Sequence, residues 1–539
     1  MARPVVVPGT PPRPARTTAP VVLQGATRFS EEPADFFDPV QLVRRMRGIP
    51  PVMRMLEKAK IDHRHGPARR PGDWMLAYAA FVAGKEVNLQ PWYRRESSNT
   101  SLWNACGFRG VPAYQTVWER FAELEQDPEI ITRAVNYVIQ LARRREPRIG
   151  MWVTLDGTEC QTHAQPRHAC GPDDDCRTRG KRRQPRLARV SPETAAELRE
   201  REAEIEDDHP VRSPTQAAST DPSDLIPIPP TGTREETDTG VRWVSGGHWW
   251  SSRDRDAGTR SYSNGKHWHG MMHIKAVDIV TGAPIAVLVS PADVNEHTAF
   301  PDLYSRCVQA IGTDPIACVA DRGYATDDVH EFLIERDCTP VIPYRRRNRT
   351  SPRTPQASKH TDSQGIPLCQ HCGVPGDFVR FSEKRGGPRL WFRCSMPSTP
   401  ECHNEQSIAC KTDIRQLLPI WKTSPIYAAL NTMRGVFEQV HEHSRVYFRS
   451  GGKSLRDRPR RIGINAHQLR ANAAVLVEWM WVLVRQGWLG SRPERVEPTP
   501  IPTEKPMQRV LRFRKKHSLV GGSYPSRGAL PKAVAHASP

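Results

Sequence analysis

The sequence lacks any apolar run long enough to span a membrane. A membrane-spanning helix needs roughly 18 to 20 apolar residues, and the best candidate, residues 473–489, is interrupted by Glu478 and Arg485. The N-terminal stretch MARPVVVPGTPPRPARTTAP lacks the continuous apolar core of a secretory signal. These absences predict a cytoplasmic protein with no membrane partner. Its 12 cysteines are therefore interpreted first as thiols or metal ligands, because disulfides are rare in that compartment.

Acidic residues are scarce relative to basic ones. The chain has 59 Asp and Glu against 78 Lys and Arg, which gives a formal net charge of +19 and a pI of about 9.6. The basic residues also cluster, for example in 179–189 and in 505–516. A clustered surplus of this size predicts a polyanionic partner, with nucleic acid as the first candidate. The alternative is a basic surface that only keeps the protein soluble.

Large apolar residues are too few at both ends of the chain to form a core. Residues 1–36 are rich in Pro, Thr and Arg, and residues 491–539 form a basic tail, so both are expected to be disordered. Residues 37–147 have helical periodicity and could hold a helix-turn-helix, with a plain helical scaffold as the alternative. The sequence thus predicts a disordered segment at 1–36, a helical domain at 37–147 and a disordered tail at 491–539. Between them, residues 148–344 and 412–490 are predicted to form an α/β core with an insertion at 160–265, and residues 345–411 to form an inserted module.

Apolar periodicity divides the central region into strands and helices. Strands are predicted at 151–155, 272–280, 284–289, 316–320 and 340–343. Helices are predicted at 112–124, 298–311 and 465–488, and two more are predicted to begin after N-caps at Asp127 and at Thr326. A strand hairpin followed by alternating helices and strands indicates a mixed sheet covered by helices. Residues 160–265 depart from any packed pattern and are predicted to be a partly disordered insertion.

Two of the predicted strands each deliver an aspartate where they end. The run 151–155 leads to Asp156, and the run 316–320 leads to Asp321 in the stretch PIACVADRGY. Open α/β sheets present their chemistry at the carboxyl ends of strands. A lone aspartate in such a position more often caps a turn, but two such ends in one chain favour a site for a divalent metal ion.

A third acid candidate lies on a helix predicted at 425–447. Glu438 lies four residues after Arg434 and seven before Arg445, so the three side chains share one helical face. A surface stripe of ion pairs is the alternative interpretation.

Cysteines gather in the inserted module. Cys369 and Cys372 form a CxxC pair, and Cys394, Cys402 and Cys410 follow. Two thiolates from one tight turn can reach adjacent positions of a tetrahedral zinc ion. The spacing therefore predicts a zinc-ribbon-like module with Cys402 or Cys410 as the fourth ligand, and free thiols in a loop are the alternative. A looser group has no recognised ligand spacing, and no metal is predicted there; it consists of Cys160, His163, His168, Cys170 and Cys176.

Four stretches together resemble the DDE-type transposases of bacterial insertion sequences, which have a ribonuclease H-like catalytic core. They are VTLDGTE around Asp156, HWHGMMHIKAVDIVTGAPIAVLVSPADVNEHTAF at 267–300, VADRGY around Asp321, and NTMRGVFEQVHEHSR around Glu438. The order of two aspartates and a helical glutamate is that of the family. In its best-described branch, Tyr and Lys stand where this chain has Asn431 and Arg445.

The resemblance implies an α/β fold with a ribonuclease H-like mixed sheet, in which Asp156, Asp321 and Glu438 bind Mg²⁺ or Mn²⁺. Two such ions can activate the nucleophile and stabilise the leaving oxygen of an in-line attack on DNA, and carboxylate oxygens suit these hard cations. The expected DNA-binding residues are Arg322, Arg434 and Arg445. The implied partners are the element ends and the target DNA, with self-association on DNA as a dimer in the nucleoid.

Two other functions stay open from the sequence. A metal-dependent nuclease on the same core would cut DNA without strand transfer, and a catalytically inactive zinc-containing protein would only bind DNA. The presence of all three acids counts against the inactive protein. An assay of strand transfer with terminal inverted repeats separates the transposase from the nuclease.

Overall fold

The computed structural model describes the central part of the chain. It covers residues 38–59, 70–164, 166–169, 234–238, 240–245, 248–261, 267–343, 366–384, 387–409, 427, 430, 431, 434 and 458–489. The segments 1–36 and 491–539, for which disorder is predicted, lie outside these residues. No described helix is both long enough and apolar enough to cross a membrane.

Helices α1 to α7 occupy the first described part of the chain. They are α1 (Pro39–Arg47), α2 (Pro50–Leu56), α3 (Pro71–Ala83), α4 (Leu89–Glu96), α5 (Thr100–Ala105), α6 (Tyr114–Leu124) and α7 (Ile130–Arg143). Helix α3 is apolar on all sides and is buried accordingly, with Tyr78 and Phe81 packed against Phe121 of α6.

The predicted cap at Asp127 is wrong. The N-cap of α7 is Glu129, and Ile130 N–H bonds to the backbone oxygen of Asp127 instead of its side chain.

A mixed sheet forms the centre of the fold. Its strands are β1 (Trp152–Gln161), β6 (Gly258–Ser261), β7 (His267–Asp278), β8 (Pro284–Pro291), β9 (Ala317–Ala320) and β10 (Thr339–Val341). The order is β10-β9-β1-β7-β6, and β8 pairs with β7. Strand β1 is antiparallel to β7 and parallel to β9, which is parallel to β10. The fold is therefore a mixed α/β fold.

Asp156 lies inside β1 and not at its end, which differs from the expectation. Parallel pairing with β9 stops at Leu155 opposite Ala320. Antiparallel pairing with β7 continues to Gln161 opposite Gly270. Because β7 supplies backbone partners beyond Asp156, the strand continues. Asp156 instead marks the point where β1 separates from β9.

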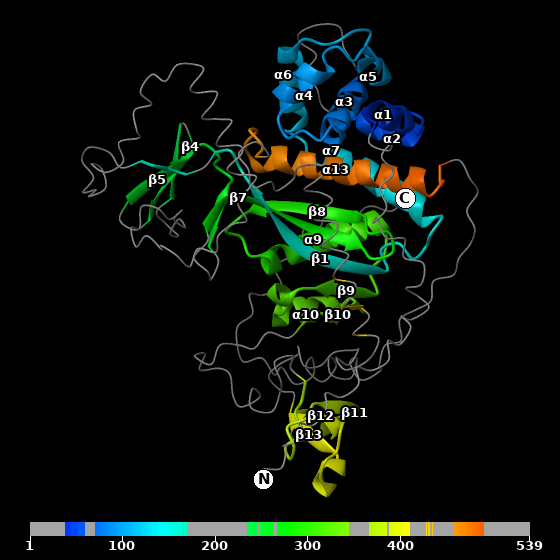
Figure 1. Ribbon diagram of the computed structural model, residues 1–539, viewed down its shortest axis with the longest axis vertical. Coiled ribbons are helices and arrows are strands. Elements are labelled where there is room, and N and C mark those ends of the chain that lie inside the picture. Colours follow the sequence, from blue (N-terminus) through cyan, green and yellow to red (C-terminus); the bar gives the residue numbers. More distant parts are fainter. Residues whose placement is uncertain are drawn as a thin grey trace, which may run out of the picture.

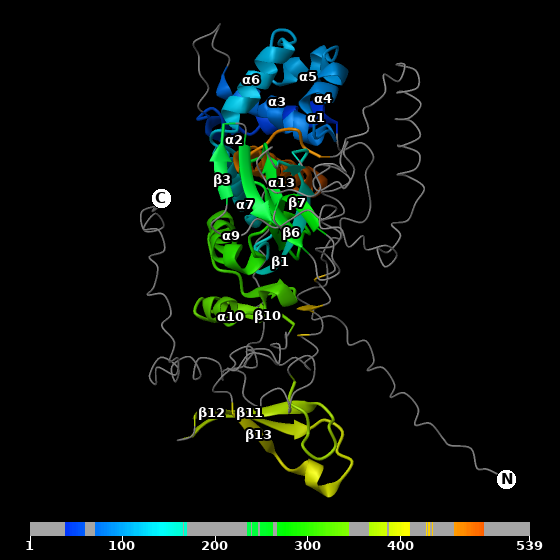
Figure 2. The ribbon, with the colours of Figure 1, turned by 90° about the vertical axis from the view of Figure 1, so that its left-hand side faces the viewer.

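Helix α13 (Ile464–Arg485) runs between the N-terminal helices and the central sheet, as Figures 1 and 2 both show. Its polar residues bond to its neighbours. Gln468 accepts from Val289 N–H at 2.8 Å and donates to the Val287 oxygen at 3.1 Å, both on β8. Asn472 donates to Pro128, just before α7. One helix thus satisfies backbone groups of β8 and joins them to the helical layer.

One further helix precedes β9, and another follows it. Helix α9 (Glu296–Ile311) packs against β8 and β7 and ends at Gly312, whose φ of 76° suits glycine. Helix α10 (Asp327–Ile334) follows the short 3₁₀ turn η3 (Arg322–Tyr324). The predicted cap is confirmed, because the Thr326 side chain accepts from Val329 N–H at 3.3 Å.

Part of the region predicted to be unpacked forms a second sheet, in the order β2-β5-β4-β3. Its strands are β2 (Arg167–His168), β3 (Arg234–Thr237), β4 (Gly240–Ser245) and β5 (His248–Ser252). Trp243 is buried and stacks on His269 of the central sheet at a ring-centroid distance of 6.0 Å. A third sheet lies in the inserted module, formed by β11 (Gly376–Lys384), β12 (Gly387–Cys394) and β13 (Gln406–Ala409).

Candidate functional site

The two candidate aspartates lie on neighbouring parallel strands. Since Leu155 pairs with Ala320, the next residues, Asp156 and Asp321, face each other where β1 and β9 separate. Each carboxylate accepts a hydrogen bond from a nearby backbone N–H, Asp156 from Gly157 at 2.8 Å and Asp321 from Gly323 at 2.7 Å. These bonds fix one oxygen of each side chain.

The surroundings of Asp156 disfavour its ionised form. Burial raises the pKa of Asp156 to about 7, and the negative charges of Asp321 and Glu296 act in the same direction. The hydrogen bond from Gly157 and the positive charge of Arg434 lower it. An excess of negative charge in a buried place is the condition that a bound divalent cation would relieve.

Glu296 is a carboxylate of this site that the sequence did not reveal. It is the first residue of α9, and its Oε1 accepts from Arg260 Nη1 of β6 at 2.9 Å. Burial is the largest cause that raises the pKa of Glu296, and Arg260 lowers it. An acid at the start of a helix is ordinary, because it interacts favourably with the helix dipole. Nothing in its sequence context distinguishes it from such an acid.

The third predicted acid, Glu438, lies outside the described residues, as does Arg445. Arg434 is described, and it lies close enough to Asp156 to lower the pKa of that carboxyl. Just before it, Tyr427 and Leu430 belong to one buried apolar cluster with Trp152 of β1 and Val319 of β9. Tyr427 and Leu430 therefore lie with the strands that lead to the two aspartates.

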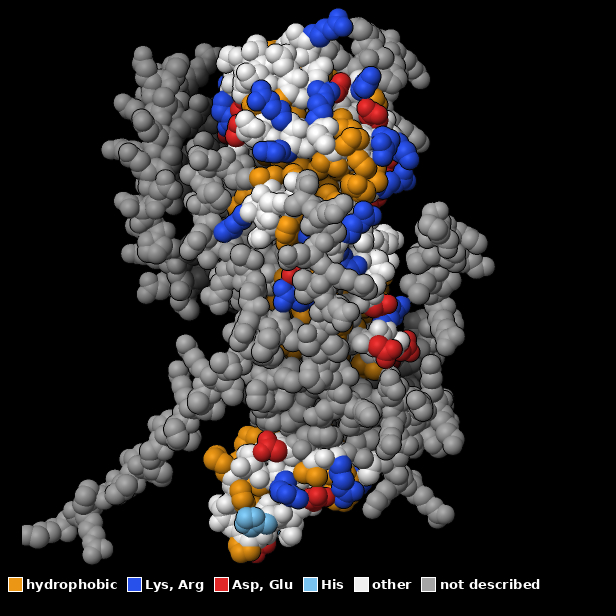
Figure 3. All heavy atoms as spheres, turned by 90° about the vertical axis from the view of Figure 1, so that its right-hand side faces the viewer, with side chains coloured by type: hydrophobic (Ala, Val, Ile, Leu, Met, Phe, Trp, Pro, Cys, Tyr) orange, Lys and Arg blue, Asp and Glu red, His pale blue; other side chains and the backbone are white. Residues whose placement is uncertain are grey.

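Basic side chains are dispersed over the face seen in Figure 3. Lys and Arg lie among acidic and apolar side chains over the N-terminal helices there. Arg322 is exposed in η3, directly after Asp321. On this face, the described part of the basic surplus is spread out instead of gathered in one patch.

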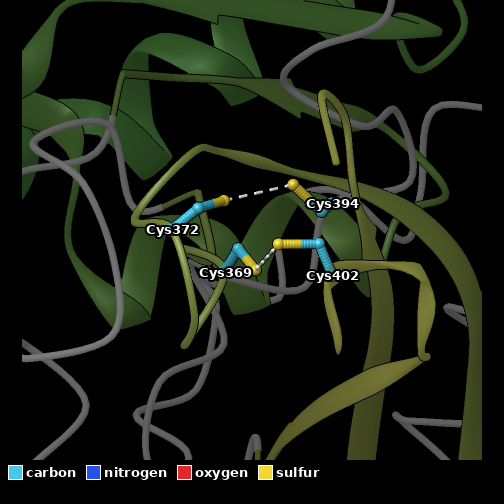
Figure 4. A group of neighbouring side chains, drawn as sticks. All are labelled: Cys369, Cys372, Cys394 and Cys402. Atoms are coloured by element: carbon cyan, nitrogen blue, oxygen red, sulfur yellow. Dashed lines mark hydrogen bonds between the residues drawn. The ribbon is translucent and has the colours of Figure 1, made fainter. Parts of the chain in front are cut away.

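Four cysteines of the inserted module converge, as Figure 4 shows. Cys369 and Cys372 come from the turn before β11, Cys394 ends β12, and Cys402 lies in the short 3₁₀ turn η5 (Pro400–His403). The sulfurs of Cys369 and Cys402 are 3.8 Å apart, and those of Cys372 and Cys394 are 3.5 Å apart. Four sulfurs about 2.3 Å from a tetrahedral zinc ion would be about 3.8 Å apart. Cys410 lies outside the described residues.

Polar neighbours favour the thiolate form of Cys369 and Cys402, whereas burial raises the pKa of Cys394 to about 12. Gln406 Nε2 donates to Cys369 Sγ at 3.1 Å. The Thr399 hydroxyl lies 3.3 Å from Cys402 Sγ, and this contact is the main reason that the pKa of Cys402 falls to about 6. Thiolates are the form that binds zinc, so the cluster has the chemistry of a closed structural metal site.

Cys160 lies in a different group from the one suggested by sequence proximity. Its ligand atom lies within 4.8 Å of those of His273 and His467, and all three residues are buried. His168 instead packs on Trp250 in the second sheet, and Cys170 and Cys176 lie outside the described residues. The buried side chains of Lys275 and Arg470 interact electrostatically with Cys160. The positive charge of Arg470 opposes a divalent metal ion, so we interpret this group as core packing.

We expect His467 to make folding sensitive to acid. Burial lowers the pKa of His467 from 6.5 to about 4, so the unfolded chain binds more protons between those pH values. The contribution of the neutral side chain to the free energy of unfolding is fully present above pH 6.5. As the pH falls towards 4, this contribution is lost and the free energy of unfolding decreases by about 3 kcal/mol. In His467→Gln, the fall in thermal unfolding midpoint between pH 7 and pH 4.5 should be smaller. The exposed His163→Gln control should behave like the wild type, and an equal acid sensitivity in both variants would contradict the assignment.

Comparisons with known proteins bear on the same region. Residues 224–425 match the family model described as the transposase DDE domain. This segment contains Asp321 and Glu296, whereas Asp156 and Glu438 lie outside it. No curated protein matches the chain. Among solved structures, the cryo-EM structure of a piggyBac transposase synaptic complex with hairpin DNA covers 93% of this chain and 89% of that chain, with 9% identity and a TM-score of 0.34.

Proposed function

We propose that this chain is a DDE-type transposase, on the match of residues 224–425 to the transposase DDE domain, and that Asp156, Asp321 and Glu438 are the acids with which it cuts and joins DNA. The observation that carries the proposal is the placement of Asp156 beside Asp321 where β1 separates from β9. Arg434 lies close to Asp156, and Glu438 follows it by four residues in the sequence. A helix through these two residues would bring the glutamate towards the same site.

We propose Mg²⁺ or Mn²⁺ as the cofactor of this site. Carboxylate oxygens are the ligands that these hard cations prefer, and the two aspartates offer them from half-buried positions. When bound, such ions activate the attacking hydroxyl and stabilise the leaving oxygen. Asp156 and Asp321 would hold the ions, and the guanidinium of Arg434 would orient the phosphate by charge-assisted hydrogen bonds. Arg322 and Arg445 are the other proposed DNA contacts.

The wider organisation follows from the same proposal. We propose that the central mixed sheet is a ribonuclease H-like core and that the helical region α1 to α7, which shares its hydrophobic core with the sheet, contributes to DNA binding. The element ends and the target DNA would be the substrates, and two copies of the chain would act together on DNA in the nucleoid. The net charge of +19 supports a polyanionic partner.

An assay with element-end DNA tests the proposed function. Full-length protein is incubated with DNA that carries the terminal inverted repeats, a target plasmid, and Mg²⁺ or Mn²⁺. We expect cleavage at the repeats and products joined to the target. Cleavage without joined products would favour the nuclease, and binding without cleavage would favour the inactive DNA-binding protein.

We also propose that Cys369, Cys372, Cys394 and Cys402 bind one structural zinc ion. The four sulfurs lie within 4.8 Å of one another, at separations that suit tetrahedral coordination. With four protein ligands there is no open position for water or substrate. The ion would therefore hold the module together and take no part in the cleavage reaction.

We expect Cys402→Ser to lose the zinc ion. A serine hydroxyl binds zinc far more weakly than a thiolate, so the content measured by plasma mass spectrometry should fall from about one to nearly zero per chain. The matched control is Cys410→Ser, which removes the other cysteine that the spacing allowed and should keep the zinc. Freshly purified wild-type protein without zinc would reject the site, and loss of zinc in Cys410→Ser alone would reassign the fourth ligand.

A further inference from the structure

Glu296 reaches the backbone of β1 next to Asp156. A β-carbon built on Gly157 would lie 2.8 Å from Cδ of Glu296 and 2.9 Å from Sδ of Met272. Real β-carbons do not approach other atoms so closely, so a side chain at position 157 would displace the glutamate. The glycine that follows Asp156 thus leaves the space that the carboxylate of Glu296 fills.

Glu296 also joins the elements that hold the site together. Its Oε1 forms an ion pair with Arg260 Nη1 at 2.9 Å, and both side chains are largely shielded from solvent. The buried Tyr324 lies near Glu296, but its hydroxyl has no hydrogen-bond partner among the described residues. Tyr324 ends η3, three residues after Asp321. One side chain of α9 is thereby paired with β6, lies against the strand of Asp156 and is near the turn of Asp321.

Glu296 influences Asp156 through its charge. Its negative charge raises the pKa of Asp156, after burial and the charge of Asp321. Among the described residues, groups whose ligand atoms all lie within 4.8 Å of one another include cysteines and histidines but no carboxylates. The carboxylates of Glu296, Asp156 and Asp321 therefore do not all lie within that distance of one another.

We propose that Glu296 is a positioning residue of the catalytic centre: it fixes the Asp156–Gly157 segment against the turn of Asp321, and its charge strengthens binding of the divalent ion. This inference rests on the proposed function of the two aspartates. It predicts that the side chain acts on metal affinity, an effect that a purely structural acid would not have.

The test is Mn²⁺ binding to the full-length protein without DNA, measured by calorimetry. Glu296→Gln keeps the side-chain volume and removes one charge near the ion, so the dissociation constant should rise on the order of tenfold. In end cleavage, the Mn²⁺ concentration for half-maximal rate should rise by a similar factor, and the maximal rate should recover at high Mn²⁺. Asp328→Asn, which removes an exposed acid from the first turn of α10, should leave both values unchanged.

Arg260→Gln separates the charge effect from the loss of the ion pair. It breaks the same pair but keeps the glutamate charge, so Mn²⁺ should bind at least as tightly as to the wild type. If Glu296→Gln does not fold, the double variant Glu296→Gln/Arg260→Gln, which leaves no unpaired arginine, is compared with Arg260→Gln and should again bind about tenfold more weakly.

Two results would overturn the inference. One is unchanged Mn²⁺ affinity without the Glu296 charge, and the other is equal weakening in Glu296→Gln and Arg260→Gln, which would indicate a structural ion pair. Asp321→Asn distinguishes this failure from failure of the proposed function. If Asp321→Asn loses Mn²⁺ binding while Glu296→Gln keeps it, only the role of Glu296 is refuted. If Asp321→Asn also binds Mn²⁺ normally, the proposed catalytic site is refuted.

Discussion

Asp321→Asn is expected to abolish DNA cleavage and joining while binding of the element ends survives. Asparagine keeps the side-chain volume, and its Oδ1 can still accept the hydrogen bond from Gly323 N–H, so η3 should form as before. The substitution removes a formal charge from the metal site. Losing several kcal/mol of transition-state stabilisation corresponds to a rate lower by roughly a thousandfold or more. Gel assays of end cleavage and strand transfer measure the loss, and a gel-shift assay measures binding.

Asp302→Asn is the matched control for this prediction. Asp302 is exposed on α9, so its replacement makes the same change in net charge without touching the aspartate pair. It should cleave and join DNA like the wild type. Metal-dependent cleavage by Asp321→Asn at the wild-type rate would reject the assignment and leave the DNA-binding alternative.

The sequence was sufficient to locate the two aspartates but not to describe their strands fully. Short apolar runs predicted strands before Asp156 and Asp321, and the two strands are neighbours in the sheet. The prediction placed Asp156 at a strand end because the apolar run stops there. The strand continues because β7 pairs with it as far as Gln161, and such pairing depends on residues more than a hundred positions away.

The contacts around the aspartates come from tertiary structure that no local pattern encodes. Glu296 has the sequence context of any acid at a helix start, and only the packing of α9 brings it to Gly157. The second sheet was missed for a similar reason. Its strands are short and partly polar, and Trp243 is buried because His269 of another sheet stacks on it.

The cysteine module shows how far spacing alone reaches. The CxxC pair and Cys394 predicted three members of the cluster, because one tight turn presents two thiolates to one ion. Spacing left Cys402 and Cys410 as equal candidates for the fourth. The turn η5 brings Cys402 into the cluster, next to Thr399. The position of Cys402 is a property of this turn and not of the number of intervening residues.

Arg434→Ala is expected to weaken both catalysis and the electrostatic part of DNA binding. The guanidinium lies close enough to Asp156 to lower the pKa of that carboxyl, so a scissile phosphate at the metal site would lie within its reach. Loss of a charge-assisted hydrogen bond of about 2 to 3 kcal/mol lowers the cleavage rate by roughly 30- to 150-fold. Loss of one phosphate contact should also reduce the slope of log binding constant against log salt by about 0.9.

Arg306→Ala is the control that separates a phosphate contact from a general loss of positive charge. Arg306 lies on α9 and forms an ion pair with Glu129 at 2.7 Å. Its replacement by alanine lowers the net charge of the protein by the same amount and removes no proposed contact with DNA. Its salt slope and cleavage rate should match the wild type. If Arg434→Ala lowers the rate but keeps the wild-type slope, Arg434 acts only on Asp156, because a lost phosphate contact must change the number of counterions released.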